Sequence, residues 1–162
     1  MRATLMMVFV AAGFAGALSL AAQPDDPAEF PKEFRTFAHV KTVLIGPQSP
    51  YAATDAGFHH IYANPQAVEG YKTGKFPDGS ILVYDLLEAK ESPANTTEGA
   101  TRRIDVMVKE SARYAATGGW HFMSFAGGDP AAQKLTVEQQ RKCAACHAQR
   151  KDHDFVFSQF RK

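Results

Sequence analysis

Alternating apolar and polar residues predict strands in four stretches of the chain. These stretches are rich in aromatic and β-branched residues, and turn-forming residues flank most of them; they cover residues 57–63, 81–87, 104–109 and 120–125. Alternation in the second stretch divides its side chains between two faces, with Leu82, Tyr84 and Leu86 on one and Ile81, Val83, Asp85 and Leu87 on the other. The pattern indicates that β-sheet is a large part of the fold.

Helix signals lie before and between these strands. Residues 34–45 mix aromatic, β-branched and polar positions, which predicts a short helix that passes into a strand. Asn64 followed by Pro65 is typical of a helix start, because asparagine caps the first turn and proline fits its first position. We therefore expect a helix over residues 66–71.

The second half of the chain contains one irregular segment and one further helix. Residues 91–102 contain proline, asparagine, glycine and several threonines without periodicity, so they are interpreted as a loop or a wide hairpin. Thr136, with Gln139 three positions later, matches a capping box. This helix leads directly into Cys143.

Composition narrows the class of protein. A chain of 162 residues, with 45% apolar, 11% aromatic and 22% charged residues, is typical of one globular core. The formal net charge is +1 and no stripe of lysine and arginine is present. These features argue against a nucleic-acid partner and against a polybasic membrane-surface protein.

The N-terminus predicts export. Arg2 precedes an apolar run that ends in small residues, as in a secretory signal peptide, and we place cleavage after Ala21. A retained membrane anchor is the alternative. The predicted organisation is a signal peptide over residues 1–21, a flexible lead-in over 22–31 and one domain over 32–162, located in the periplasm.

Two cysteines and a histidine carry the clearest chemical signal. Cys143, Cys146 and His147 match C-x-x-C-H, the motif in which two thiols attach a haem covalently and the histidine becomes an axial iron ligand. A local disulfide or a thioredoxin-like redox pair is the alternative, but no βαβ unit precedes the motif. We expect one haem c per chain, with His147 as the iron ligand.

The position of the motif narrows the type of cytochrome. Fifteen residues follow His147 and none is methionine, unlike a small electron-transfer cytochrome c. A four-helix cytochrome c′ is disfavoured because residues 81–87 and 120–125 are strand-like. We expect an α+β haem protein whose C-terminal helix attaches the haem.

Several ordered motifs resemble those of the cytochrome P-460 and cytochrome c′-beta superfamily. They span about residues 30–160 and comprise residues 58–62 and 70–79, Gly119, Trp120, Phe125, and the haem motif followed by residues 154–158. The resemblance implies a mainly antiparallel sheet that packs on the haem, commonly in a homodimer. It also implies chemistry on small nitrogen species: P-460 proteins oxidise hydroxylamine, whereas c′-beta proteins bind nitric oxide at a hydrophobic distal face.

Two positions bear on whether the protein resembles the P-460 enzymes or the c′-beta binding proteins more closely. Tyr84 aligns with the lysine that P-460 proteins cross-link to haem, so the lysine cross-link is expected to be absent. Tyr84 then packs, donates a hydrogen bond to ligand, or forms an unusual cross-link. Asp105 aligns with a distal carboxylate that accepts protons in P-460 enzymes, and its alternative is a solvated acid at a strand edge.

Other side chains in the strands have a structural and a functional interpretation. Three histidines are either metal ligands or structural histidines. Two methionines are either iron ligands or core residues. Four phenylalanines either line a distal pocket or belong to the core of the sheet. These residues are His59, His60, His121, Met107, Met123, Phe58, Phe76, Phe122 and Phe125.

These observations leave two classes of function. The favoured one is a binding protein whose open haem site captures nitric oxide or a related small molecule. The other is an enzyme that oxidises hydroxylamine or nitric oxide, with Asp105 accepting protons and a partner cytochrome accepting electrons. A simple electron carrier ranks third, because it needs a sixth ligand that the sequence does not clearly supply.

Overall fold

The computed structural model describes residues 30–132 and 135–160. The expected signal peptide over residues 1–21, and the lead-in as far as residue 29, lie outside the described residues. No helix among the described residues is long and apolar enough to cross a membrane.

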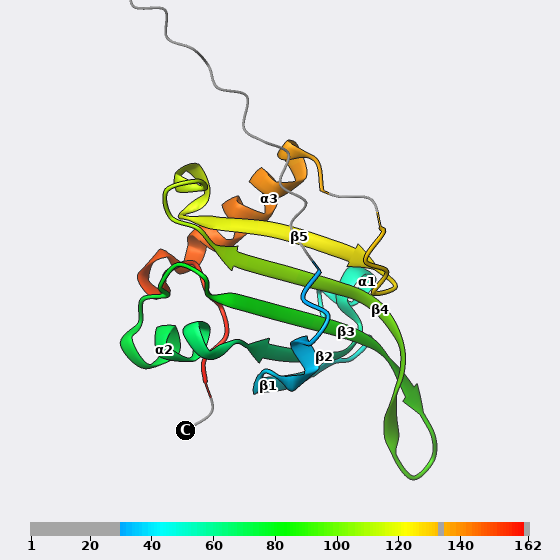
Figure 1. The fold of residues 1–162 in the computed structure, drawn as a ribbon. Helices are drawn as coiled ribbons and strands as arrows, with labels where there is room; N and C mark the ends of the chain where they lie inside the picture. The colour runs from blue at the N-terminus through cyan, green and yellow to red at the C-terminus, as the bar shows by residue number, and fades with distance from the viewer. Residues whose placement is uncertain (1–29, 133–134, 161–162) are drawn as a thin grey trace, which may run out of the picture.

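A five-stranded antiparallel sheet forms the centre of the fold (Figure 1). Its strands follow one another in chain order, and each pairs with the next one: β1 (Ala38–Ile45), β2 (Gly57–Ala63), β3 (Ile81–Glu91), β4 (Thr96–Lys109) and β5 (Trp120–Ala126). The helices are α1 (Ala52–Asp55), α2 (Pro65–Thr73) and α3 (Val137–His147), with short 3-10 turns at Phe34–Thr36, Ala115–Thr117 and Ala148–His153. The expected α+β class with a C-terminal helix is confirmed.

Capping side chains begin both longer helices as the sequence predicts. The Asn64 side chain accepts a hydrogen bond from the Ala67 amide at 2.9 Å, and Pro65 occupies the first turn of α2. At α3, the Gln139 amide donates to the Thr136 hydroxyl at 3.2 Å. The Thr136 amide in turn donates to the Gln139 side chain at 2.8 Å, which completes the capping box.

The segment interpreted as a loop or wide hairpin is largely strand. β3 continues to Glu91 and β4 begins at Thr96, so the two strands form an arm that extends beyond the rest of the sheet (Figure 1). Most side chains of this arm are exposed on both faces. The backbone ladder and polar contacts, such as that between Glu98 and His60 at 2.8 Å, therefore hold the arm, and no apolar alternation marks it in the sequence.

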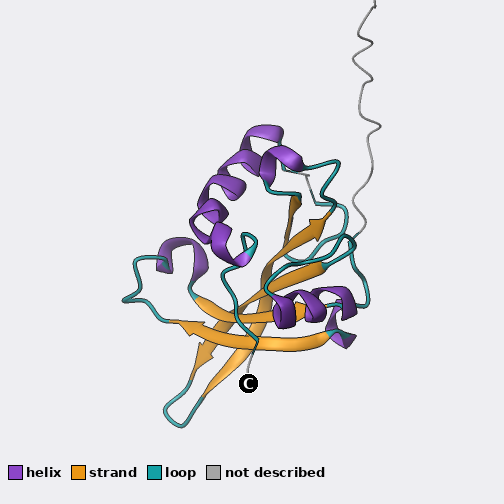
Figure 2. Cartoon of the chain, turned by 90° about the vertical axis from the view of Figure 1, so that its left-hand side faces the viewer, coloured by secondary structure: helices purple, strands orange, loops and turns teal. Residues whose placement is uncertain are grey.

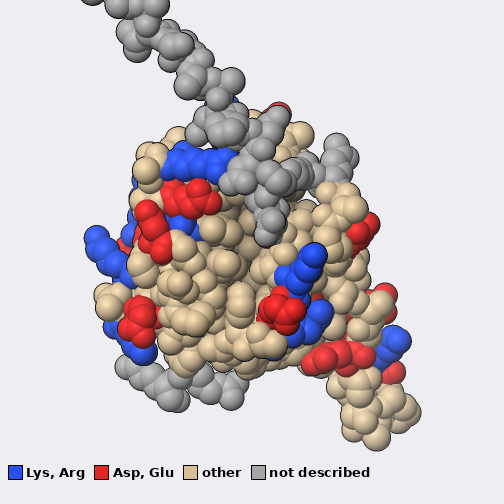
Figure 3. Space-filling model, in the orientation of Figure 1, with Lys and Arg blue, Asp and Glu red and all other residues tan. Residues whose placement is uncertain are grey.

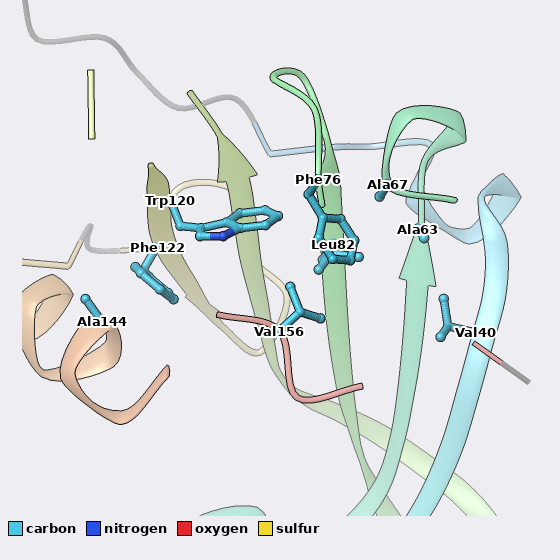
Figure 4. Packing of buried hydrophobic residues seen from close by; sticks show 9 residues of the cluster. All are labelled: Val40, Ala63, Ala67, Phe76, Leu82, Trp120, Phe122, Ala144 and Val156. Carbon is cyan, nitrogen blue, oxygen red and sulfur yellow. The ribbon is translucent and has the colours of Figure 1, made fainter. Parts of the chain in front are cut away.

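Two apolar clusters lie on opposite faces of the sheet. The first, shown in Figure 4, joins strand residues to α2, α3 and the C-terminal segment: Val40, Ala63, Ala67, Phe76, Leu82, Trp120, Phe122, Ala144 and Val156. The second comprises Phe34, Val83, Ile104, Val106, Met123 and Phe125. Leu82 and Val83 belong to different clusters, as the alternation predicts. We call the first surface the α3 face and the second the opposite face; Figure 2 shows α3 along one side of the sheet.

Charge is well mixed over the surface seen in Figure 3. Lysine and arginine lie close to aspartate and glutamate on this side of the molecule, and no large area of one sign is visible there. Exposed pairs such as Lys72 with Glu69, whose charged atoms are 2.6 Å apart, contribute little to stability.

Gly57 sets the tight connection between α1 and β2. Its φ is +128°, and a Cβ there would lie 2.1 Å from the carbonyl oxygen of Leu87. We expect Gly57→Ala to lower the free energy of unfolding by at least about 1–3 kcal/mol, because the strained backbone and the clash add. Denaturation with urea measures this loss. Gly46→Ala is the control, since a Cβ there meets nothing within 4 Å, and equal midpoints for the two variants would contradict the expectation.

Candidate functional site

The C-x-x-C-H motif, which is predicted to attach a haem, lies in the last turns of α3. Cys143 and Cys146 are free thiols, the first half-buried and the second exposed. Residues three and four positions apart share one side of a helix, so Cys143, Cys146 and His147 form one group at the C-terminal end of α3. Burial raises the pKa of the Cys143 thiol, and the negative charge of Asp105 raises it further.

His147 is oriented by the backbone that follows it. Its Nδ1 lies 2.7 Å from the carbonyl oxygen of Phe155. Because a carbonyl only accepts hydrogen bonds, Nδ1 carries the proton and Nε2 keeps a free lone pair. Burial lowers the pKa of His147, so the ring is neutral at neutral pH. Phe122 and Phe157 lie 5.0 and 5.1 Å from the ring, measured between centroids.

The backbone that carries the Phe155 carbonyl is anchored at the preceding residue, Asp154. Both residues have left-handed backbone conformations, with φ of 51° and 67°. Lys109 Nζ lies 2.7 Å from one oxygen of the Asp154 carboxylate, and the Phe76 amide donates to the other at 2.9 Å. The Trp120 indole donates to the Asp154 carbonyl at 2.8 Å. Sequence reasoning missed Lys109, because a lysine at the end of an amphipathic strand looks like an ordinary surface residue.

Tyr84 and Asp105 lie side by side on the α3 face. In the antiparallel register Tyr84 is opposite Asp105, and Asp105 is opposite Ser124. Directly opposite residues point to the same face, which here is the face of Leu82 and Phe122. The structure therefore brings both sequence-predicted residues to the side of the sheet that carries the haem motif.

Asp105 is paired on both carboxylate oxygens. Arg103 Nε donates to one at 2.8 Å, and the Ser124 hydroxyl donates to the other at 2.5 Å. Asp105 lies in β4, between β3 and β5, so it is not at an edge of the sheet. Its side chain is 33% exposed, which leaves it accessible from the α3 face.

The Tyr84 hydroxyl is hydrogen-bonded to His59. His59 lies on β2, its Nδ1 contacts the hydroxyl, and the two rings are 4.6 Å apart with an edge-to-face geometry. The other ring nitrogen, Nε2, is hydrogen-bonded to the carbonyl oxygen of Asp55. Arg103 Nη2 donates to the Asp55 carboxylate at 2.7 Å, so one arginine links Asp55 to Asp105.

The remaining candidates divide between the two faces. His60 points to the opposite face, where its Nδ1 is 2.9 Å from the Thr42 hydroxyl and its Nε2 is 2.8 Å from a Glu98 oxygen. Phe58 stacks on His60, and His121 stacks on Tyr114 at 4.5 Å. Met123 and Phe125 are core residues of the opposite face, whereas Phe76 and Phe122 are core residues of the α3 face, with Met107 packed against them.

This donor set fits a haem. Two free thiols and a histidine with an available Nε2 are the groups that covalent haem attachment needs. Phe122 and Phe157 supply apolar surface beside the histidine. Tyr84, Asp105 and Ser124 supply polar groups on the same face.

Comparison with known proteins assigns the family. The family model described as cytochrome P460 matches residues 31–158, which is most of the chain. A search of curated proteins found no match to the chain. Membership of this family indicates a haem protein, in agreement with the arrangement of Cys143, Cys146 and His147. On this match and this geometry, the chain belongs to the cytochrome P460 family.

Proposed function

We propose that the protein is a periplasmic c-type haem protein that binds nitric oxide or a related small nitrogen species at an open iron site. Cys143 and Cys146 would form thioethers to the haem, and His147 would bind its iron. The observation that supports this most strongly is the bond between His147 Nδ1 and Phe155, which leaves Nε2 free and fixes the ring at the end of α3. The haem supplies an iron atom to which a small ligand binds.

The contacts of the other candidate iron ligands support an iron that would keep one position for a small molecule. Both nitrogens of His59 already make hydrogen bonds. Met107 packs against the apolar cluster of the α3 face, and Met123 lies on the opposite face. These contacts favour a ligand-binding protein over a simple electron carrier, which would use a protein side chain at this position.

An enzyme that oxidises hydroxylamine or nitric oxide is the second candidate. The position of Asp105, on the face that carries the haem motif, supports it. However, both oxygens of Asp105 already accept hydrogen bonds from Arg103 and Ser124. Each of these oxygens keeps a second lone pair, which could still accept a proton from substrate. In this candidate the electrons pass to a partner cytochrome.

The family resemblance also supports a homodimer as the working form. Export to the periplasm, with cleavage after Ala21, is compatible with covalent haem attachment at Cys143 and Cys146. Both statements are proposals drawn from the sequence.

An optical spectrum tests the proposed function. Because Tyr84 stands where P-460 proteins have their cross-linking lysine, the porphyrin keeps its conjugation. We expect protein purified from the periplasm, with Ala22 as its first residue, to show an ordinary high-spin c-type spectrum when reduced, and to change on addition of nitric oxide. Rapid oxidation of hydroxylamine would favour the enzyme instead. A far red-shifted Soret band would reveal a cross-link, and a spectrum unchanged by nitric oxide would contradict the proposal.

A further inference from the structure

A buried chain of hydrogen bonds ends at Tyr84. It runs from the Asp55 carbonyl through the imidazole of His59 to the Tyr84 hydroxyl. His59 is only 2% exposed, so solvent does not compete for its nitrogens. Nδ1 is hydrogen-bonded to the Tyr84 hydroxyl, and Nε2 to the Asp55 carbonyl, with the same hydroxyl a more distant contact of Nε2 at 3.3 Å. The direction of the two shorter bonds can be worked out from the chemistry of the groups.

The carbonyl fixes the direction of the whole chain. A carbonyl oxygen cannot donate, so His59 Nε2 must carry the proton. A neutral imidazole has one N–H, which leaves Nδ1 as an acceptor. The Tyr84 hydroxyl must then donate to Nδ1. Burial is the largest influence on His59 and lowers its pKa, as do Arg103 and Arg102, although the Asp55 contacts oppose this. The neutral ring that this direction requires is thus favoured.

The first link of the chain is held firmly by the local fold. Asp55 ends α1, and Gly57 makes the turn that returns the chain to His59. Arg103 donates to the Asp55 carboxylate at 2.7 Å, and Arg102 donates to the carbonyl of Ala56. Two arginines on β4 therefore hold the end of α1 in place over β2.

We propose that His59 is a positioning residue that makes Tyr84 a hydrogen-bond acceptor toward the bound ligand. The site then favours small nitrogen species that bear N–H or O–H groups, such as hydroxylamine, over nitric oxide. This inference rests on the proposed function, because it needs a haem ligand on the α3 face. The only proton of the phenol is directed at His59, while its oxygen keeps lone pairs for a donor. Nitric oxide has no hydrogen to give, so Tyr84 does not help to retain it.

Two substitutions of His59 separate this role from simple packing. His59→Phe removes both nitrogens, which frees the Tyr84 proton to point at the ligand. We expect hydroxylamine to bind the ferric protein about fivefold more weakly and nitric oxide to leave the ferrous protein about fivefold more slowly, as expected for roughly one hydrogen bond in each case. His59→Asn restores an acceptor near the position of Nδ1 and should return both values toward those of the parent.

Control variants complete the comparison. His60→Phe changes the adjacent histidine, which lies on the opposite face with Thr42 and Glu98 as partners, and should leave the selectivity of the site unchanged. Tyr84→Phe should weaken hydroxylamine binding without speeding the loss of nitric oxide. If nitric oxide leaves Tyr84→Phe faster than the parent, Tyr84 is a donor to the ligand and the inference is wrong.

A measurement on the unaltered protein keeps the inference testable even if His59→Phe does not fold. Nitrogen NMR of labelled holoprotein, reduced and bound to carbon monoxide, should show His59 protonated at Nε2 and bare at Nδ1. A ring protonated at Nδ1, or at both nitrogens, at neutral pH would overturn the inference. So would unchanged ligand selectivity in folded His59→Phe. Absence of haem or of any ligand binding in the parent would instead contradict the proposed function.

Discussion

Replacing both Cys143 and Cys146 with alanine is expected to abolish covalent haem attachment completely. Each thiol can form one thioether, and the chain contains no other cysteine. Denaturing mass spectrometry of the parent should give the mass of the processed chain plus one haem, whereas the double variant should give the mass of the polypeptide alone. Each single variant can keep one thioether and is the intermediate case. A parent protein that carries a disulfide and no haem would contradict this expectation.

His147→Ala separates attachment from iron ligation. Both thiols remain, so haem is still attached, but the axial ligand is lost and the high-spin c-type spectrum should change. The Phe155 carbonyl also loses its partner, which further destabilises the holoprotein. His153→Ala is the matched control, because His153 is also in the C-terminal segment but its side chain is half exposed and forms an ion pair with the exposed Asp152. A normal spectrum in His147→Ala would contradict the assignment of the iron ligand.

Asp154→Ala is expected to cause the largest loss of stability among single substitutions away from the haem motif. The side chains of Lys109 and Asp154 are 7% and 18% exposed, and removal of the carboxylate leaves the Lys109 ammonium buried without its charged partner. The Phe76 amide also loses its acceptor, and alanine is strained at a φ of 51°. Breaking a buried ion pair costs about 3–5 kcal/mol, so the urea midpoint should fall markedly.

Two further variants test the cause of this loss. Asp154→Asn keeps a side-chain acceptor and a residue type that tolerates the left-handed conformation, so it should lose less stability than Asp154→Ala. Asp152→Ala removes a neighbouring carboxylate that is 65% exposed, and it should have little effect. If Asp154→Ala unfolds at the same urea concentration as Asp152→Ala, the buried pair does not hold the C-terminal segment.

The position of Asp154 connects the stability of the C-terminal segment with the orientation of His147. Asp154 is followed directly by Phe155, whose carbonyl orients His147. Strand β4 therefore reaches the site twice, through Asp105 on the α3 face and through Lys109 at its end. A substitution of Asp105 or of Lys109 therefore changes the surroundings of His147.

Local sequence determined most of the secondary structure and the proposed site of haem attachment. The caps at Asn64 and Thr136 act within three residues, and alternation in β3 reports which side chains share a face. The motif residues are adjacent on one helix, so their grouping needs no tertiary information. Of the two interpretations of residues 91–102, a loop or a wide hairpin, the structure contains a hairpin. The extent of its strands is not predicted, because exposed strands carry no apolar pattern.

Tertiary structure decided what surrounds the motif. Tyr84 meets His59 across 25 positions of the chain, Arg103 meets Asp55 across 48, and Lys109 meets Asp154 across 45. No local pattern marks such pairs, because each partner alone resembles an ordinary strand or turn residue. Resemblance to the family predicts that Tyr84 and Asp105 lie near a haem, but it leaves the direction of the Tyr84 hydroxyl open. That direction depends on the carbonyl of Asp55, a backbone group that every residue carries and that only the fold brings to His59.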